Sequence, residues 1–262
     1  RVKINLIAGG SAAELAADGM YYAHDERYEV MDETVSIMKQ AWTTPGKFDY
    51  DGKFYQIKGG QVEPKPYQSP YPPFYLGGSS DGGKDVSAKH TSVHLFWGDT
   101  ADNIAKQIAD VRERARTFGR AEDVKFGMRL QIIVRETEAE AWDAANALIE
   151  GANPNFVRGI KNMWEQSQAN TRMKELGALD DYRVGPHLWS GLTIVRPGAG
   201  VAVVGNPDQV IETLEEYVAI GCTDFCLSGY PHDVEATRVG EMVLPHFDGR
   251  RASGWTTVAA AR

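Results

Sequence analysis

The sequence has few of the signals that mark nucleic-acid-binding, membrane-spanning or metal-binding proteins. The formal net charge is -8, whereas binding to phosphate backbones needs clustered Lys and Arg. No stretch approaches the ~20 apolar residues of a membrane span, and the first residues do not have the layout of a secretory signal. The 6 histidines are scattered, and no H-E-x-x-H motif occurs. We therefore expect no nucleic acid, membrane or metal partner.

Cysteine is also scarce. The 2 cysteines, Cys222 and Cys226, have a C-x-x-x-C spacing that fits neither a zinc knuckle nor a redox C-x-x-C motif. Cys226 lies in an apolar run, which predicts a buried side chain that behaves as a small hydrophobic group. Two unpaired thiols predict a cytoplasmic protein.

Short apolar runs, each ending in glycine or polar residues and followed by a helical pattern, dominate the chain. An Asp51-Gly52 pair between aromatic residues predicts a hairpin with a two-residue turn. Thr100, Thr137 and Asn206 are expected to cap helices. The expected strands are 2–8, 74–76, 93–97, 125–134 and 224–227, and the expected helices include 27–42, 84–89, 100–116, 206–219 and 234–243.

Strands that alternate with helices predict an α/β fold with a parallel sheet. The sheet could be open and doubly wound or closed into a barrel. No G-x-G-x-x-G motif follows a strand, which disfavours an open dinucleotide-binding sheet. Residues 151–200 lose periodicity and are expected to form an insertion or lid within one barrel domain over residues 1–250, with a tail at 251–262.

Two segments at or before helix starts are candidate anion sites. Gly77-Gly78-Ser79-Ser80 precedes a helix, and its N–H groups and hydroxyls would suit a phosphate, although a plain capped turn also fits. His24-Asp25-Glu26-Arg27-Tyr28 could line the same kind of site, although a solvated helix start is the simpler reading.

Other candidates lie in or after strands. Arg129 and Gln131 are two residues apart, so the pleat points both to one face, where the arginine should meet an anion or form a structural salt bridge. Arg196 lies in a glycine-rich loop and could bind an anion or be an ordinary surface arginine. Trp97 is either a wall of the site or core, and Tyr230 and His232 are either acid–base groups or parts of a turn.

These residues lie in an ordered series of motifs that resembles the alkanesulfonate monooxygenases, which are bacterial-luciferase-like flavin enzymes. The similarity extends to about Asp248. The motifs are residues 24–28, Gln68-Ser69-Pro70-Tyr71-Pro72-Pro73, Gly77-Gly78-Ser79-Ser80-Asp81, residues 126–130 and 134–137, Val195-Arg196-Pro197-Gly198-Ala199-Gly200 and residues 227–232.

The resemblance implies a (β/α)₈ TIM barrel of the luciferase-like type, of which this chain covers about strands 4 to 8. It also implies that reduced FMN (FMNH2), supplied by an NAD(P)H-dependent FMN reductase, is used with O2 to convert an organosulfonate into an aldehyde and sulfite. The family further implies a homo-oligomer, either a dimer or a tetramer.

Residue roles follow from the same resemblance. His24, Tyr28, Ser79 and Ser80 would hold the FMN phosphate region, and Asn5 and Gly9 would lie along the flavin. Arg196 would lie on the lid that excludes water. The residues expected around the sulfonate, including the catalytic groups, are Trp97, Arg129, Gln131, Arg196, Tyr230 and His232.

Two departures from the family leave other functions open. Gln131 stands where family members have a histidine, and glutamine carries no charge and shuttles no proton. Three further βα units, of about 30 residues each, precede the matching region in the family. A luciferase-like monooxygenase acting on a sulfone or an amine-carboxylate is therefore one alternative. A non-catalytic flavin-binding, truncated barrel is another.

Overall fold

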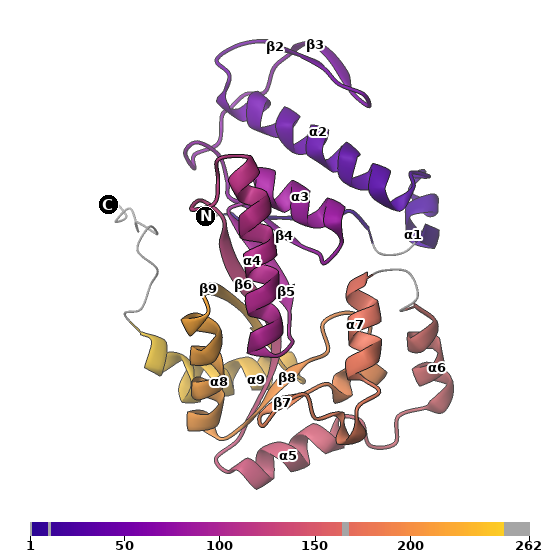
Figure 1. Ribbon diagram of the computed structural model, residues 1–262, viewed down its shortest axis with the longest axis vertical. Helices are drawn as coiled ribbons and strands as arrows, with labels where there is room; N and C mark the ends of the chain where they lie inside the picture. Colours follow the sequence, from indigo (N-terminus) through magenta and orange to yellow (C-terminus); the bar gives the residue numbers. More distant parts are fainter. Residues whose placement is uncertain (1, 10–11, 164–167, 249–262) are drawn as a thin grey trace. The chain divides into compact units, whose positions relative to one another are not determined.

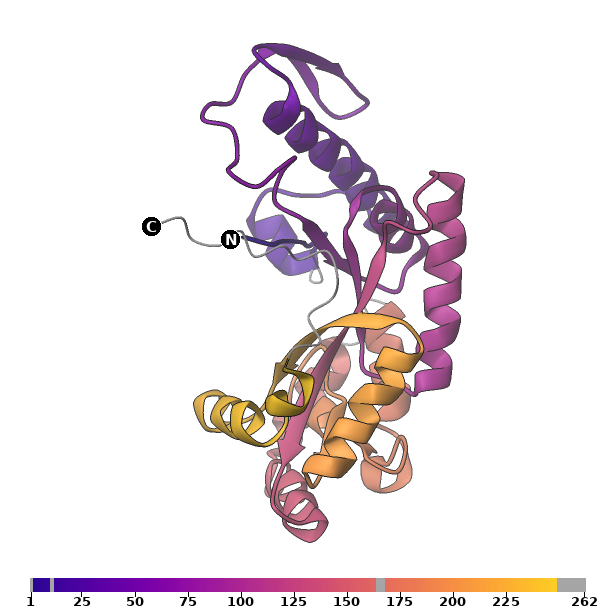
Figure 2. The same cartoon turned by 90° about the vertical axis from the view of Figure 1, so that its left-hand side faces the viewer.

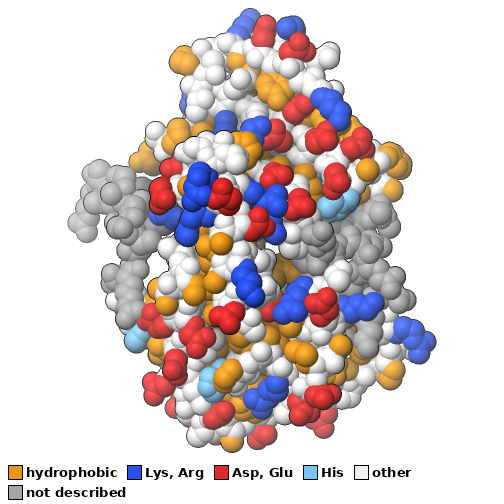
Figure 3. All heavy atoms as spheres, viewed as in Figure 1, with side chains coloured by type: hydrophobic (Ala, Val, Ile, Leu, Met, Phe, Trp, Pro, Cys, Tyr) orange, Lys and Arg blue, Asp and Glu red, His pale blue; other side chains and the backbone are white. Residues whose placement is uncertain are grey.

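The computed structural model describes residues 2–9, 12–163 and 168–248 (Figure 1), and the chain divides into two compact units. Unit 1 comprises Arg1–Phe96, Ala105–Gly127 and Glu165–Thr171, and unit 2 comprises Trp97–Ile104, Met128–Trp164 and Arg172–Arg262. Among the described residues, no helix has both the length and the apolar character needed to cross a bilayer. Acidic and basic side chains are interspersed on the face seen in Figure 3.

Unit 1 is built on the parallel strands β1 (Ile4–Leu6), β4 (Phe74–Gly77) and β5 (Val93–Trp97), the last of which ends in unit 2. Asn5 pairs with Tyr75, and Leu76 pairs with His94. The helices that follow these strands are α1 (Ala12–Ala17), α2 (His24–Thr43), α3 (Asp81–His90) and α4 (Ala101–Thr117).

The core of unit 1 lies between α2, α3 and β4. Met31 and Val35 are one helical turn apart, so both point from α2 onto Phe74 and Leu76. Trp42, two turns further along α2, stacks on the Phe74 ring at 5.8 Å between centroids. The apolar spacing in α2 therefore fixes the helix that carries His24 and Tyr28 on the sheet.

The predicted hairpin is present, but its turn is longer than expected. Strands β2 (Phe48–Asp51) and β3 (Gln56–Gly60) are antiparallel, and β2 packs against α2 (Figures 1 and 2). Asp51 pairs with Gln56, which leaves four residues in the loop. The Glu33 carboxylate accepts hydrogen bonds from the backbone N–H groups of these loop residues, the shortest being 2.7 Å from Lys53, and so stabilises the wider turn.

Unit 2 contains most of β6 (Lys125–Val134), the parallel strand β8 (Ala202–Gly205) and a short antiparallel strand β7 (Leu188–Trp189). Strand β9 (Cys222–Ser228) also pairs with β6. Helices α5 (Glu138–Ala147) and α8 (Pro207–Ala219) pack on β8, and α9 (His232–Met242) follows β9. The expected α/β fold with a mainly parallel sheet is confirmed.

Two predictions about unit 2 are wrong. Strand β8 was not expected, because its four residues lie directly after a Gly- and Pro-rich stretch that masks the apolar run. Cys226 is exposed rather than buried, and Cys222 is the buried thiol. Burial raises the pKa of the Cys222 thiol to about 12, so this cysteine is an inert core residue.

The stretch expected to form an insertion precedes β8 and is partly helical. It contains α6 (Pro154–Met163), α7 (Gln168–Leu176) and the short 3-10 segments η2 (Asp180–Tyr182) and η3 (Gly191–Ile194). A further 3-10 segment, η4 (Leu244–Phe247), follows α9. The predicted tail at 251–262 lies outside the described residues.

The cap of α8 provides a test of the local sequence signals. The Asn206 side chain accepts a hydrogen bond from the Gln209 N–H at 3.0 Å, and the Gln209 side chain accepts one from the Asn206 N–H at 2.9 Å. We expect Asn206→Ala to lower the free energy of unfolding by about 1 kcal/mol, because one helix-terminal N–H loses its partner. Urea denaturation measures this, with Glu212→Ala, an exposed change on the same helix, as the control. Equal stability of both variants would contradict it.

Candidate functional site

The first turn of α3 forms one end of a cavity in unit 1. Ser80 is buried, and its hydroxyl accepts a hydrogen bond from the Gly83 N–H at 3.3 Å. This cap starts the helix at Asp81, three residues earlier than predicted, because the cap outweighs the low helix propensity of Gly82 and Gly83.

Tyr28 of α2 lies directly against this turn. A Cβ atom placed at Gly82 would be 2.9 Å from the Tyr28 ring, and one at Gly83 would be 3.3 Å from it. The His24 ring meets the Tyr28 ring edge-on at 5.3 Å between centroids. His24, Tyr28 and Ser80 thus line one cavity of about 900 Å³. The structure brings together two motifs that are more than 50 residues apart in the sequence.

The other residues expected to bind the cofactor have different surroundings. The Ser79 hydroxyl is buried and has no hydrogen-bond partner among the described residues. Gly9 has a positive φ of 88°, and its carbonyl accepts a hydrogen bond from Arg27 of α2 at 2.7 Å. Asn5 is exposed on β1, and neither Asn5 nor Gly9 lines the cavity.

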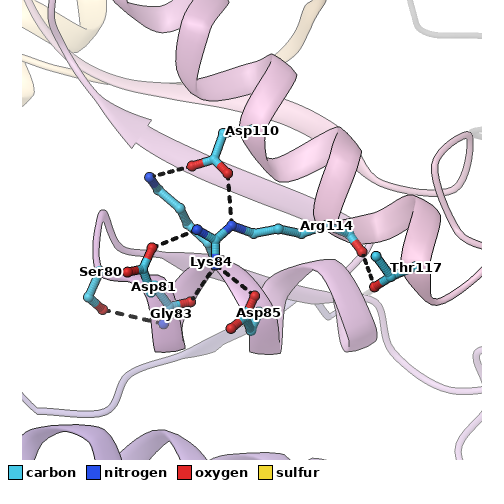
Figure 4. A network of polar contacts seen from close by, with 8 residues as sticks. All are labelled: Ser80, Asp81, Gly83, Lys84, Asp85, Asp110, Arg114 and Thr117. Atoms are coloured by element: carbon cyan, nitrogen blue, oxygen red, sulfur yellow. Dashed lines mark hydrogen bonds and ion pairs between the residues drawn. The ribbon is translucent and has the colours of Figure 1, made fainter.

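Carboxylates also line this cavity, and basic side chains neutralise several of them. Arg114 of α4 pairs with Asp81 at 2.6 Å and Asp85 at 2.8 Å (Figure 4). Arg114 and Lys84 also bind Asp110, each at 2.8 Å or less. Burial raises the pKa of Asp110, but the hydrogen bonds from Lys84 and Arg114 outweigh it and hold that pKa below the usual value. The charge near the start of α3 is therefore less negative than the sequence suggests.

A second group of candidate residues meets in unit 2. Arg129 on β6 donates a hydrogen bond to the Ser228 hydroxyl at 2.9 Å and to the Cys226 carbonyl at 3.3 Å. Gln131, two residues further along β6, is fully buried and also contacts the Ser228 hydroxyl at 2.9 Å. Arg129 and Gln131 thus share one partner on β9, as their spacing predicts for side chains on the same face.

Gln131 links this pair to the glycine-rich loop. When its amide oxygen faces Arg196, that oxygen accepts a hydrogen bond from Arg196 Nη1 at 2.8 Å, and its nitrogen donates to Ser228 Oγ at 2.9 Å. In this orientation both the amide oxygen and the amide nitrogen of Gln131 have hydrogen-bond partners. An unbroken chain of contacts therefore runs from Arg196 through Gln131 and Ser228 to Arg129.

Aromatic side chains flank the chain of contacts. The Arg196 guanidinium lies 5.9 Å from the centre of the Tyr230 ring, and the His232 ring meets Tyr230 edge-on at 4.7 Å. Trp97 lies next to Gly198, where an added Cβ would be 3.8 Å from the indole. The structure thus places Trp97 beside the Arg196 loop and gives His232 an exposed position at the start of α9.

Arg129 and Arg196 have no carboxylate partner among the described residues, unlike Arg135 and Arg172 of the same unit. Arg135 binds the buried Glu235 at 3.0 Å, and Arg172 binds the buried Asp99 at 2.6 Å. Two guanidinium groups that are linked through Gln131 and Ser228 and lack a described counter-ion suit an anionic ligand. The structural salt bridge considered for Arg129 does not occur among the described residues. No group of three or more His, Cys, Asp or Glu in the described part of the chain could hold a metal.

The sequence alone indicates no role for Ser228 or Asp99. Ser228 ends β9, and only the pairing of β9 with β6 brings it to Arg129. Asp99 accepts hydrogen bonds from Arg172 of α7 and from Asn103, and its carbonyl accepts one from the Tyr217 hydroxyl at 2.6 Å. The position of Asp99 directly after β5 is a signal for a functional or structural role. Its partners Arg172 and Tyr217 are too distant in the sequence to be identified from local patterns.

The sequence profile of the luciferase-like monooxygenases matches residues 1–224. The chain belongs to the luciferase-like monooxygenase family. That profile covers both groups of candidate residues except Ser228, Tyr230 and His232.

Solved structures agree with this luciferase-like fold. The chain is similar to riboflavin lyase (RcaE), solved with modified FMN and riboflavin, at 21% identity and a TM-score of 0.77 over 98% of this chain and 66% of that one. The EDTA monooxygenase EmoA from Chelativorans sp. BNC1 matches at 18% identity and a TM-score of 0.74 over 95% and 66% of the two chains.

A third structure shows that the fold also serves another cofactor. The coenzyme F420-dependent tetrahydromethanopterin reductase from Methanopyrus kandleri matches at 18% identity and a TM-score of 0.61, over 94% of this chain and 74% of that one. The chain thus spans just under two thirds of the length of the riboflavin lyase and the EDTA monooxygenase.

Proposed function

We propose that this chain carries the cofactor-phosphate and substrate sites of a monooxygenase that uses FMNH2 and O2 to convert an organosulfonate into an aldehyde and sulfite. The observation that carries the proposal is the pair of guanidinium groups, Arg129 and Arg196, that have no carboxylate partner and are joined through Gln131 and Ser228. An NAD(P)H-dependent FMN reductase would supply the reduced cofactor.

The residues of unit 1 fit the phosphate of FMN. The Ser79 hydroxyl is buried without a partner, Ser80 begins α3, and glycines allow Tyr28 to approach the first turn. A helix N-terminus with free N–H groups and hydroxyls binds phosphate through hydrogen bonds and the helix dipole. Arg114 supports this role because it neutralises Asp81 and Asp85 beside the turn.

When bound, the reduced flavin would supply the electrons for oxygen activation. The residues of the chain would bind and orient the substrate. Arg129 and Arg196 would each direct N–H donors toward the sulfonate oxygens, and the neutral Gln131 would hold Arg196 in place without adding charge. Tyr230 would fix Arg196 through its ring face, and Trp97 would form an apolar wall that excludes water. Tyr230 and His232 would be the groups available for proton transfer.

A panel of substrates tests the proposal. The protein, FMN, a flavin reductase, NADH and O2 are incubated with a short alkanesulfonate, a dialkyl sulfone or an amine-carboxylate, and sulfite and aldehyde are measured. We expect sulfite and aldehyde from the alkanesulfonate and little turnover of the neutral sulfone, because a sulfone offers no charge to the two arginines. Turnover of another substrate with no sulfite from any sulfonate would contradict the proposal.

An amine-carboxylate is the second candidate. Guanidinium groups bind carboxylates as well as sulfonates, and Gln131 replaces the histidine expected from the alkanesulfonate monooxygenases. The similarity to EmoA, an EDTA monooxygenase, also favours this class. If Gln131 determines which of the two substrate classes is preferred, Gln131→His should raise the ratio of sulfonate to amine-carboxylate turnover.

Substitution of Gly82 tests the phosphate site separately. A Cβ at this position would be 2.9 Å from the Tyr28 ring, so Gly82→Val should push Tyr28 away from the first turn of α3. We expect FMN binding to weaken about tenfold, equivalent to ~1.4 kcal/mol. Riboflavin, which has no phosphate, should bind almost as before. Flavin fluorescence titration measures the dissociation constants of FMN and riboflavin. Gly159→Val, where added atoms meet open space, is the control.

A further inference from the structure

A further cluster in unit 1 joins α2 to the end of α3, and two of its members, Asp32 and Lys89, line the cavity beside Ser80. The His90 ring is almost fully buried, and its Nε2 atom lies 2.7 Å from Asp32 Oδ1. Its Nδ1 atom lies 3.1 Å from the Nζ atom of Lys39, which also donates to the His90 carbonyl at 3.1 Å. Lys89 occupies the other oxygen of Asp32 at 2.7 Å. A carboxylate, an imidazole and an amine are therefore connected in that order.

The contacts determine the tautomer of His90. Because the carboxylate accepts the Nε2 proton, Nδ1 is left as an acceptor that faces the amine of Lys39. A nucleophile within hydrogen-bond reach of a base, which a third group orients, is the arrangement of nucleophilic catalysis. Here the nucleophile would be an amine rather than a hydroxyl or a thiol.

The surroundings of Lys39 favour its neutral form. The amine has no carboxylate partner among the described residues, although the faces of Tyr71 at 5.6 Å and Phe74 at 5.9 Å attract its charged form. Burial and then the charge of Arg120 lower the pKa of Lys39 to about 8, against a smaller opposing effect of Asp32, while Lys89 lowers it further. By contrast, the hydrogen bond to Glu29 raises the pKa of Lys53.

We propose that Lys39 is a reactive amine that forms a Schiff base with small aldehydes, with His90 as the base and Asp32 as the group that orients it. The Lys39 nitrogen bonds to the carbonyl carbon as the C=O π electrons move to oxygen. His90 Nδ1 takes one proton from the nitrogen and returns it to that oxygen, which gives a carbinolamine. It then passes the second nitrogen proton to the hydroxyl, which leaves as water while the nitrogen lone pair forms the C=N bond. Nothing is oxidised or reduced, and one water is released.

Reductive labelling tests the proposal directly. The protein is treated at pH 7.5 with propionaldehyde and cyanoborohydride, and modification of each lysine is followed over time by peptide mass spectrometry. We expect Lys39 to be modified at least ~tenfold faster than Lys53, because a pKa near 8 leaves far more free amine than the usual value of about 10.4. Lys53 is the more exposed residue, with 62% of its side chain accessible, so accessibility alone predicts the opposite order.

The pH profile and two variants separate reactivity from a structural role. The Lys39 rate should level off above about pH 8, whereas the Lys53 rate should keep rising. His90→Asn and Asp32→Asn should each lower the Lys39 rate about tenfold and leave Lys53 unchanged, because the base is lost or misoriented. Circular dichroism checks folding, and if one variant is unfolded the other decides. Equal rates at Lys39 and Lys53, or an unchanged ratio in a folded variant, would overturn the proposal.

Discussion

Arg196→Ala and Arg129→Ala should each lower kcat/KM for an alkanesulfonate by about 100-fold. Each side chain would make two charge-assisted hydrogen bonds to the anion, worth about 1.5 kcal/mol or more apiece, and no other described cation lies in the chain of contacts between them. Sulfite release measures the effect. Turnover of a neutral sulfone, where it is detectable, should change much less, because that substrate carries no charge.

Two comparisons sharpen this prediction. Arg196→Lys keeps the charge but loses the planar fork, so its activity should lie between those of the wild type and Arg196→Ala. Arg183→Ala is a matched control, because Arg183 stacks on Trp142 and lies outside the contacts of Gln131 and Ser228. If both alanine variants kept sulfonate turnover within twofold of the wild type, these arginines would not be the anion site.

Asp99→Ala should lower the free energy of unfolding by about 3 kcal/mol. Asp99 is 2% exposed, and its carboxylate receives two N–H groups from Arg172 and one from Asn103. Removing one partner of a buried ion pair leaves the other uncompensated. Arg172 is partly exposed and can regain water, which places the expected loss at the lower end of the range for such pairs.

Denaturation of a second variant shows whether the loss of stability comes from the contact between Asp99 and Arg172. Asp102→Ala removes an exposed carboxylate three residues away on α4 and should change stability by less than about 0.5 kcal/mol. Because Arg172 lies on α7, Asp99→Ala should also increase hydrogen exchange of the α7 amides. A stability loss equal to that of Asp102→Ala would show that Asp99 does not hold α7.

Local signals in the sequence were enough for the elements with long apolar runs and clear caps. Strands β5 and β6 match their predicted bounds because apolar residues dominate β5 and alternate with polar residues or glycine along most of β6. Thr137 and Asn206 cap helices as expected, since the cap and the residue that reciprocates it are three positions apart. The four-residue hairpin turn is not evident from the sequence, because Glu33, about 20 residues away, binds its backbone.

The candidate site was only partly accessible to the same reasoning. The spacing of Arg129 and Gln131 placed them on one face, but their link through Ser228 depends on a strand pairing between residues almost 100 positions apart. Cys226 lies on the same strand, β9, and is exposed. An apolar run in the sequence does not show which of its side chains point outward. The meeting of Tyr28 with the first turn of α3 likewise follows from helix packing.

The most direct test of the proposed function is the stoichiometry of one reaction under labelled oxygen. The protein is supplied with FMN, a flavin reductase, NADH and an alkanesulfonate under ¹⁸O2, and sulfite and aldehyde are measured together. We predict equal amounts of the two products, with one labelled oxygen incorporated per turnover. Oxygen consumption without sulfite from any sulfonate, while an amine-carboxylate or a sulfone is oxidised, would contradict the assignment of Arg129 and Arg196 to a sulfonate.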